Sequence, residues 1–110
     1  MAFEYKILGQ SAPAATTATN VYTVPAARSA VISTIVVCNR VATAATYRIA
    51  LRPAGATLAN LHYIAYDVTV GAGDSTTISL GLTLATTDVI TIYASTANLS
   101  FTVTGSEISA

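Results

Sequence analysis

Residues 89–104 read VITIYASTANLSFTVT and contain the clearest signal for the fold of this chain. In Val89–Ala94, both alternating sets of side chains are mostly apolar, which is typical of a strand covered on both faces. After a polar break at Ala97–Asn98, hydroxylated residues alternate with three bulky apolar ones, Leu99, Phe101 and Val103. This period of two predicts a half-buried strand with one face on a core.

Similar patterns recur along the chain at intervals of roughly ten residues. They predict six further strands at Phe3–Ile7, Val21–Val24, Ala30–Cys38, Tyr47–Arg52, His62–Val68 and Thr76–Leu82. Gly, Pro, Asn and Asp cluster in the breaks between them, and no segment has a convincing helical pattern. Antiparallel pairing follows, because parallel strands need long crossover connections. We therefore expect an all-β fold, an antiparallel β-sandwich of about eight strands with jelly-roll or Greek-key-like order.

The length of 110 residues fits one domain spanning 1–110. Residues 11–20, SAPAATTATN, have low complexity and lack bulky side chains. We expect this segment to be a flexible arm or loop, of the kind that often lies on a neighbouring subunit.

The chain is poor in charge, with five basic and five acidic residues and a formal net charge of zero. Mean hydropathy is +0.60. Small free monomers usually have a net charge of roughly 2 to 8 in magnitude, and neutral surfaces tend to associate. We expect the protein to pack against copies of itself in a symmetric homo-oligomer, or against a larger assembly.

The same composition argues against other partners. Without a cluster of Lys and Arg, there is little to neutralise the phosphates of nucleic acid. No run of eighteen apolar residues exists, so a transmembrane helix is not expected. The N-terminus lacks a secretory pattern and the chain has one cysteine, which together indicate synthesis in a reducing cytoplasm.

Two groups of residues are candidates for subunit contacts. Strands that are apolar on both faces need a covering partner, so we predict an interface at Val31, Ile35, Val37, Ile90 and Ile92. Arg48 and Arg52 share one strand face and are predicted to bind carboxylates of a neighbouring subunit, or else to be solvated.

The tyrosines are candidates for a carbohydrate-binding site, because Tyr63, Tyr66 and His62 lie close in sequence. Strict alternation, however, places Tyr63 on the opposite face from the other two. The alternative is that these tyrosines are core or interface residues whose hydroxyls stay in contact with water. The chain has no Trp, which weakens the sugar-binding interpretation.

No catalytic or cofactor site is predicted. His62 is the only histidine, and no G-x-S-x-G nucleophile pattern is present. Cys38 ends a run of Ile and Val and is expected to be a small buried hydrophobe. One Cys and one His do not make a zinc site, and the aspartates lack the spacing of a calcium loop. We expect a protein that is not an enzyme and needs neither metal nor cofactor.

Four stretches carry a resemblance to a known class of proteins: VYTVPAARSAVISTIVVCNR (21–40), TYRIALRPAGATLANLHYIAYD (46–67), LATTDVITIYASTANLSF (84–101) and GSEIS (105–109). They resemble small virion structural proteins of tailed bacteriophages, either head-decoration proteins or tail- and fibre-associated modules. The similar proteins often have glycine where this chain has Ala27.

The resemblance implies a β-sandwich with a non-enzymatic, structural role in the virion, reached after synthesis in the host cytoplasm. It implies contacts with other virion proteins, namely major capsid or tail proteins, besides copies of itself. It supplies no catalytic or ligand-binding residues. A carbohydrate-binding adhesion module for the host surface is the alternative function.

Overall fold

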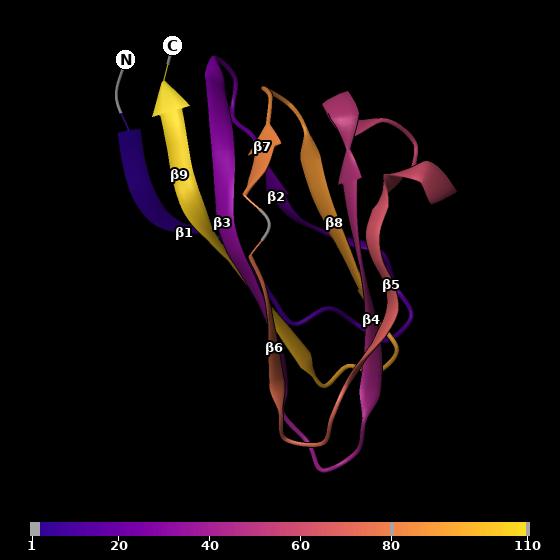
Figure 1. The fold of residues 1–110 in the computed structure, drawn as a ribbon. Helices are drawn as coiled ribbons and strands as arrows, with labels where there is room; N and C mark the ends of the chain where they lie inside the picture. The colour runs from indigo at the N-terminus through magenta and orange to yellow at the C-terminus, as the bar shows by residue number, and fades with distance from the viewer. Residues whose placement is uncertain (1–2, 80, 110) are drawn as a thin grey trace.

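The computed structural model describes residues 3–79 and 81–109, which form two antiparallel sheets packed face to face (Figure 1). Sheet A contains, in spatial order, β1 (Phe3–Ser11), β9 (Leu99–Ser109), β3 (Arg28–Asn39) and β6 (Ser75–Ile78), with β7 (Leu82–Leu84) also paired to β3. Sheet B contains β2 (Thr19–Thr23), β8 (Val89–Ala94), β4 (Ala45–Arg52) and β5 (Tyr63–Val70). Two single 3₁₀ turns lie between β4 and β5, at Pro53–Gly55 and Asn60–His62.

The strands pair as a nested series. β1 pairs with β9, β2 with β8, β3 with β6 and β7, and β4 with β5. This is the order of a jelly roll, which a long hairpin adopts when it rolls up into two sheets. The start of β1 and the end of β9 consequently lie side by side at one end of sheet A (Figure 1). The predicted antiparallel sandwich is confirmed.

The structure has one strand more than the sequence pattern indicates. The predicted strand at Thr76–Leu82 is divided into β6 and β7, which pair with different parts of β3. Gly81 follows β6 with a φ of +61°, a backbone conformation that glycine adopts without steric cost. The chain therefore leaves the sheet between the two strands and rejoins it at Leu82.

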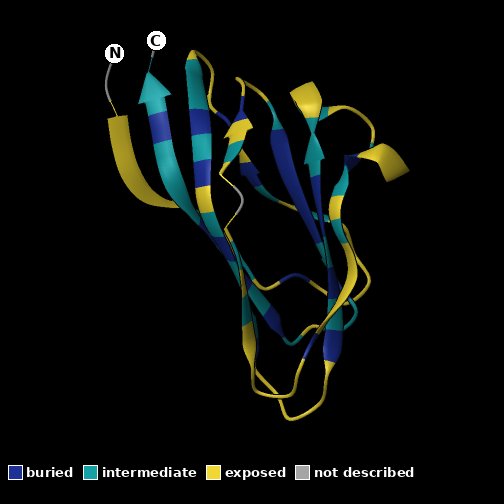
Figure 2. Ribbon diagram, in the orientation of Figure 1, coloured by how far each residue is buried: buried dark blue, intermediate teal, exposed yellow. Residues whose placement is uncertain are grey.

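The inner faces of the two sheets enclose the hydrophobic core (Figure 2). The Tyr47 ring meets the Phe101 ring edge-on at 6.2 Å between centroids, which joins β4 of one sheet to β9 of the other. The alternation predicted for β9 is confirmed. The largest fully buried apolar side chains come from five strands and the loop after β2: Phe101, Ile32, Ile35, Ile49, Ile90, Ile92, Leu99, Val24, Val37, Val70 and Val103.

A β-bulge in the middle of β3 determines which side chains enter this core. Ile32 pairs with Gly105 and Thr34 with Thr104, so Ser33 is the extra residue. A bulge reverses the inward and outward alternation beyond it. A Cβ on Gly105 would overlap the carbonyl oxygen of Val31, so the bulged backbone needs glycine opposite it.

Residues 11–20 connect the two sheets. Ser11 ends β1, and Thr19 and Asn20 begin β2. Between them Pro13 is buried, and the Thr16 amide donates a hydrogen bond to the Ala94 carbonyl at 2.8 Å. The structure therefore places this segment as a loop against β8 of its own chain and not as a projecting arm.

Ala27, in the turn between β2 and β3, has a φ of +60°. This left-handed conformation favours glycine and is costly for a residue with a Cβ. This turn therefore has a backbone geometry that glycine would adopt without steric cost.

Candidate functional site

Most of the predicted apolar interface belongs to the core of the single chain. Ile35, Val37, Ile90 and Ile92 are each 0% exposed, because they point between the two sheets. The prediction that they form a contact surface is therefore wrong for these four residues. Val31 differs: it pairs with Ser106 and points outward, since the bulge at Ser33 separates its face from that of Ile35.

The outer face of sheet A is a broad surface without charged residues. We call it the neutral face. Strand pairing aligns its residues in rows across β1, β9, β3, β6 and β7, and the outward positions are Phe3, Tyr5, Ile7, Gln10, Ser29, Val31, Thr34, Val36, Cys38, Ser75, Thr77, Thr83, Ser100, Thr102, Thr104, Ser106 and Ile108.

All ten charged residues of the chain are described, and none of them lies on the neutral face. Glu4, Lys6, Arg28 and Glu107 belong to sheet A but lie on its inner side or at its edge. Sheet B contains Arg48, Arg52 and Asp67. The loops contain Arg40, Asp74 and Asp88. A surface with Phe3, Tyr5 and Ile7 more than half exposed and no charge is typical of a contact site.

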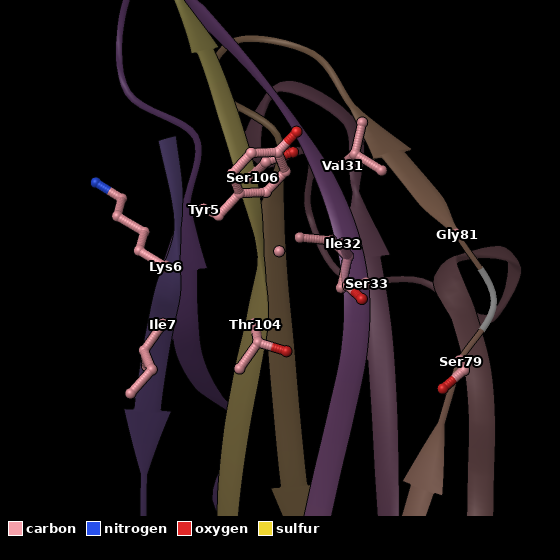
Figure 3. A pocket seen from close by; sticks show the side chains of 11 residues that line it. Tyr5, Lys6, Ile7, Val31, Ile32, Ser33, Ser79, Gly81, Thr104 and Ser106 are labelled. Carbon is pink, nitrogen blue, oxygen red and sulfur yellow. The ribbon is translucent and has the colours of Figure 1, made fainter. Parts of the chain in front are cut away.

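A groove of about 760 Å³ crosses the neutral face. Its lining includes Tyr5, Lys6 and Ile7 of β1, Gly105 of β9, and Ser79 and Gly81 from the segment between β6 and β7. Figure 3 shows the Tyr5 ring near Ser106, its cross-strand partner, while the Lys6 side chain points away from the groove. The Tyr5 side chain is 84% exposed, so this edge of the groove offers a projecting aromatic ring.

Beneath this face, a buried carboxylate attaches β1 to the rest of the sandwich. Glu107 is only 3% exposed. It accepts hydrogen bonds from the Tyr22 hydroxyl at 2.6 Å, from Lys6 Nζ at 2.9 Å and from Arg28 Nη1 at 3.3 Å. Arg28 Nη1 also contacts Glu4 at 2.9 Å, so the network joins β1, β2, β3 and β9.

These contacts shift the ionisation of the network. The Tyr22 hydroxyl and the Lys6 ammonium hold the pKa of Glu107 below its usual range. Burial and the neighbouring carboxylate raise the pKa of Tyr22. The sequence analysis did not single out Glu107, although its position continues the inward alternation of Leu99, Phe101 and Val103.

The outer face of sheet B has charged groups that bond within the chain. Arg48 forks onto Asp67, with Nε to Oδ1 at 2.7 Å and Nη2 to Oδ2 at 3.3 Å. The guanidinium carbon lies 4.1 Å from the centroid of the Tyr66 ring and 4.4 Å from that of Tyr93. Its hydrogen bond to Asp67 raises the pKa of Arg48, and the same bond lowers the pKa of Asp67.

The predicted carboxylate for Arg48 thus exists, but it belongs to the same chain. Arg52 is occupied in the same way. Its guanidinium donates to the carbonyls of Ala56 and Gly55 at 2.7 and 3.0 Å, and to Asn20 Oδ1 at 3.0 Å. Both arginines form hydrogen bonds to loops and strands of their own chain. These bonds explain the positions of the two side chains without a contact to a neighbouring subunit.

The predicted sugar-binding residues are rearranged by two irregularities in β5. Ile64 is an extra residue, because Ala65 pairs with Ile49 and Tyr63 with Ala50, and a further extra residue lies between Ala65 and Val68, where Asp67 has a φ of 52°. Tyr63 and Tyr66 consequently meet edge-to-face, with 4.9 Å between ring centroids. The expectation that alternation separates these two tyrosines is therefore wrong.

His62 does not belong with the exposed tyrosines. It is 8% exposed in the turn before β5, and its Nδ1 accepts the Ala59 amide at 3.1 Å. Asn60, which the sequence analysis missed, instead lines an open hollow of about 440 Å³ with Tyr63 and Tyr66. No pattern in the sequence marks this asparagine, because its position depends on the 3₁₀ turn at Asn60–His62.

Cys38 is a free thiol that is half-buried on the neutral face, beside Ser100 of β9, and is less covered than expected. In the described part of the chain, no three His, Cys, Asp or Glu side chains gather as a metal site requires. Among the same residues, no helix has the length and hydropathy needed to cross a membrane.

Comparisons with protein-family models, with curated proteins and with solved structures found no match to this chain.

Proposed function

We propose that this protein is a non-enzymatic structural component of a tailed-phage virion that assembles with copies of itself through the neutral face. One observation supports this most directly. A chain with ten charged residues places none on the outer face of sheet A, while Phe3, Tyr5 and Ile7 are 57, 84 and 56% exposed there. Such an arrangement leaves apolar area in water unless a partner covers it.

The size of the face is sufficient for a stable contact. β3 has twelve residues and therefore extends about 40 Å at about 3.3 Å per residue. Four strands side by side are about 19 Å wide at about 4.8 Å spacing. The product approaches the roughly 800 Å² that each partner of a typical stable complex buries. Each apolar Å² covered contributes about 25 cal/mol before the costs of association and ordering.

A second copy is the partner that suits this face best. Covering a charged surface with an uncharged one removes ions from water without pairing them, which is strongly unfavourable. Two neutral faces can pack together without that penalty. The serine and threonine hydroxyls between the apolar residues remain able to bond across the contact.

The virion assignment is supported by the resemblance of residues 21–40, 46–67, 84–101 and 105–109 to phage structural proteins. The jelly-roll strand order, which recurs in viral capsid domains, is compatible with it. We infer that major capsid or tail proteins are the second class of partner, and that the protein is made in the host cytoplasm before it joins the particle.

The self-association is tested by light scattering over a concentration series. We expect the wild-type protein to form a closed oligomer and the Tyr5→Lys, Val31→Lys double variant to be a monomer with unchanged circular dichroism. Tyr66→Lys is the matched control, because Tyr66 is 54% exposed but lies on sheet B. A wild-type monomer at every concentration, or an intact oligomer in the double variant, would contradict the proposal.

The virion assignment has its own test. Mass spectrometry of purified phage particles, from a lysate in which this protein is produced, should detect it in fixed proportion to the major capsid or tail protein. Its loss from particles on mild washing, together with no effect on particle assembly when its gene is deleted, would refute a structural role.

A further inference from the structure

We propose that the hollow between Asn60, Tyr63 and Tyr66 binds an uncharged sugar residue of a glycan. The hollow of about 440 Å³ lies on sheet B and not on the neutral face. It is bordered by two phenol rings and one carboxamide. Aromatic rings pack against the C–H faces of a pyranose, while amide and phenol groups exchange hydrogen bonds with its hydroxyls.

The aromatic rings are held in place before any ligand arrives. Arg48 lies against the ring of Tyr66 and is itself locked by Asp67. Tyr63 is braced edge-to-face against Tyr66. Side chains that are already ordered lose less entropy on binding, so a small neutral ligand can be retained by few contacts.

The polar groups of the hollow are available to a ligand. Within residues 3–79 and 81–109, no hydrogen bond joins the Asn60 carboxamide or the hydroxyls of Tyr63 and Tyr66 to another protein group. By contrast, the hydroxyl of buried Tyr22 is bonded to Glu107. Three unpaired donor and acceptor groups around one hollow can each bond to a hydroxyl of the same sugar.

The charge around the hollow selects for a neutral ligand. The nearest ionic groups, Arg48 and Asp67, neutralise each other through two hydrogen bonds. An anionic sugar would have to compete with Asp67 for the guanidinium.

The test is a titration of the full-length, isotope-labelled protein with glucose, galactose, mannose, N-acetylglucosamine and N-acetylgalactosamine, followed by amide NMR shifts. We expect at least one of these sugars to shift signals within residues 59–67 and the Arg48 Nε signal. Tyr66→Ala and Tyr63→Ala should each weaken that binding about tenfold, equivalent to about 1.4 kcal/mol. Oligosaccharides that contain the active sugar should bind the wild-type protein at least as tightly, which would identify a glycan as the source.

Two variants keep the test independent of folding. Tyr66→Phe preserves the ring on Arg48 and removes only the hydroxyl, and Asn60→Ala alters only an exposed turn residue. Tyr5→Ala is the matched control, because it deletes the more exposed tyrosine of the neutral face and should leave sugar binding unchanged.

Three results would overturn this proposal. The first is the absence of shifts with every neutral sugar, together with silence on a broad glycan array. The second is binding that survives the Tyr63→Ala, Tyr66→Ala double variant. The third is binding of acidic sugars alone. None of these results bears on self-association, which depends on the opposite sheet.

Discussion

The outer faces of the two sheets differ in what they leave for a partner. On sheet B, Arg48 and Arg52 bond to groups of their own chain, and Thr91 between them is only 3% exposed. On sheet A, Tyr5 projects with 84% of its surface exposed and no charge lies nearby on the face. Sheet B therefore has its arginines bonded within the monomer, although Tyr66 remains 54% exposed there, whereas the neutral face exposes uncharged, partly apolar surface that another subunit can cover.

The largest effect is expected where the neutral face depends on close backbone contact. Gly105→Ala would place a Cβ against the Val31 carbonyl, so the bulge at Ser33 would have to move. We expect a loss of about 3 kcal/mol in the free energy of unfolding, as for severe overpacking, together with loss of self-association. Urea denaturation and light scattering measure the two effects.

Ser106→Ala is the control for this substitution, since it changes the neighbouring outward residue of β9 without adding volume. Its free energy of unfolding should stay close to that of the wild type. If Gly105→Ala were as stable as Ser106→Ala, the bulge would not constrain the shape of the neutral face.

The next effect concerns the attachment of β1, which supplies Phe3, Tyr5 and Ile7 to the neutral face. Glu107→Gln removes the charge that Lys6 and Arg28 face, and we expect a loss of about 1–2 kcal/mol in stability at neutral pH. The wild-type pKa of Glu107 is lowered by folding. Its contribution is therefore complete above the ordinary glutamate pKa of about 4.3, and is lost as pH falls through the lower folded value.

Thermal unfolding between neutral and acidic pH measures this dependence. The wild-type melting temperature should fall more steeply below about pH 4.3 than that of Glu107→Gln. Part of the slope should remain in the variant, because the pKa values of Glu4 and Asp67 are also lowered. Parallel curves for the two proteins would show that Glu107 does not hold β1 through its charge.

The smallest effect is expected on sheet B. Arg48→Lys keeps the positive charge but cannot fork onto Asp67 or stack flat between Tyr66 and Tyr93. We expect a small fall in melting temperature and no change in self-association. Arg40→Lys is the control, since the Arg40 guanidinium donates a hydrogen bond to the Ala97 carbonyl at 2.7 Å and faces no carboxylate there among the described residues. Loss of the oligomer in Arg48→Lys would remove the distinction between the two faces.

The strand pattern could be predicted from the sequence because it reflects local alternation. Leu99, Phe101 and Val103 point into the core as expected, because the inward and outward alternation of side chains along β9 is not interrupted at these residues. Ile35 and Val37 were assigned to a contact surface because strict alternation groups them with Val31. Nothing in the local sequence marks Ser33 as a bulge, since the bulge results from pairing with Gly105, which lies far along the chain.

The candidate sites show the same limit. Arg48 was predicted to bind a carboxylate, but its partner Asp67 lies in the neighbouring strand, where a positive φ at a bulge directs it. Tyr63 and Tyr66 were recognised, whereas Asn60 joins them only through the 3₁₀ turn before β5.

The sequence by itself determined a charge-poor, all-β, antiparallel sandwich, because composition and period-two alternation are local properties that each strand shows alone. The tertiary structure decided which apolar residues are covered and which remain exposed. It did so through bulges in β3 and β5, and through the pairing of strands distant in sequence. A single extra residue in a strand exchanges its two faces, and only the partner strand shows where that residue lies.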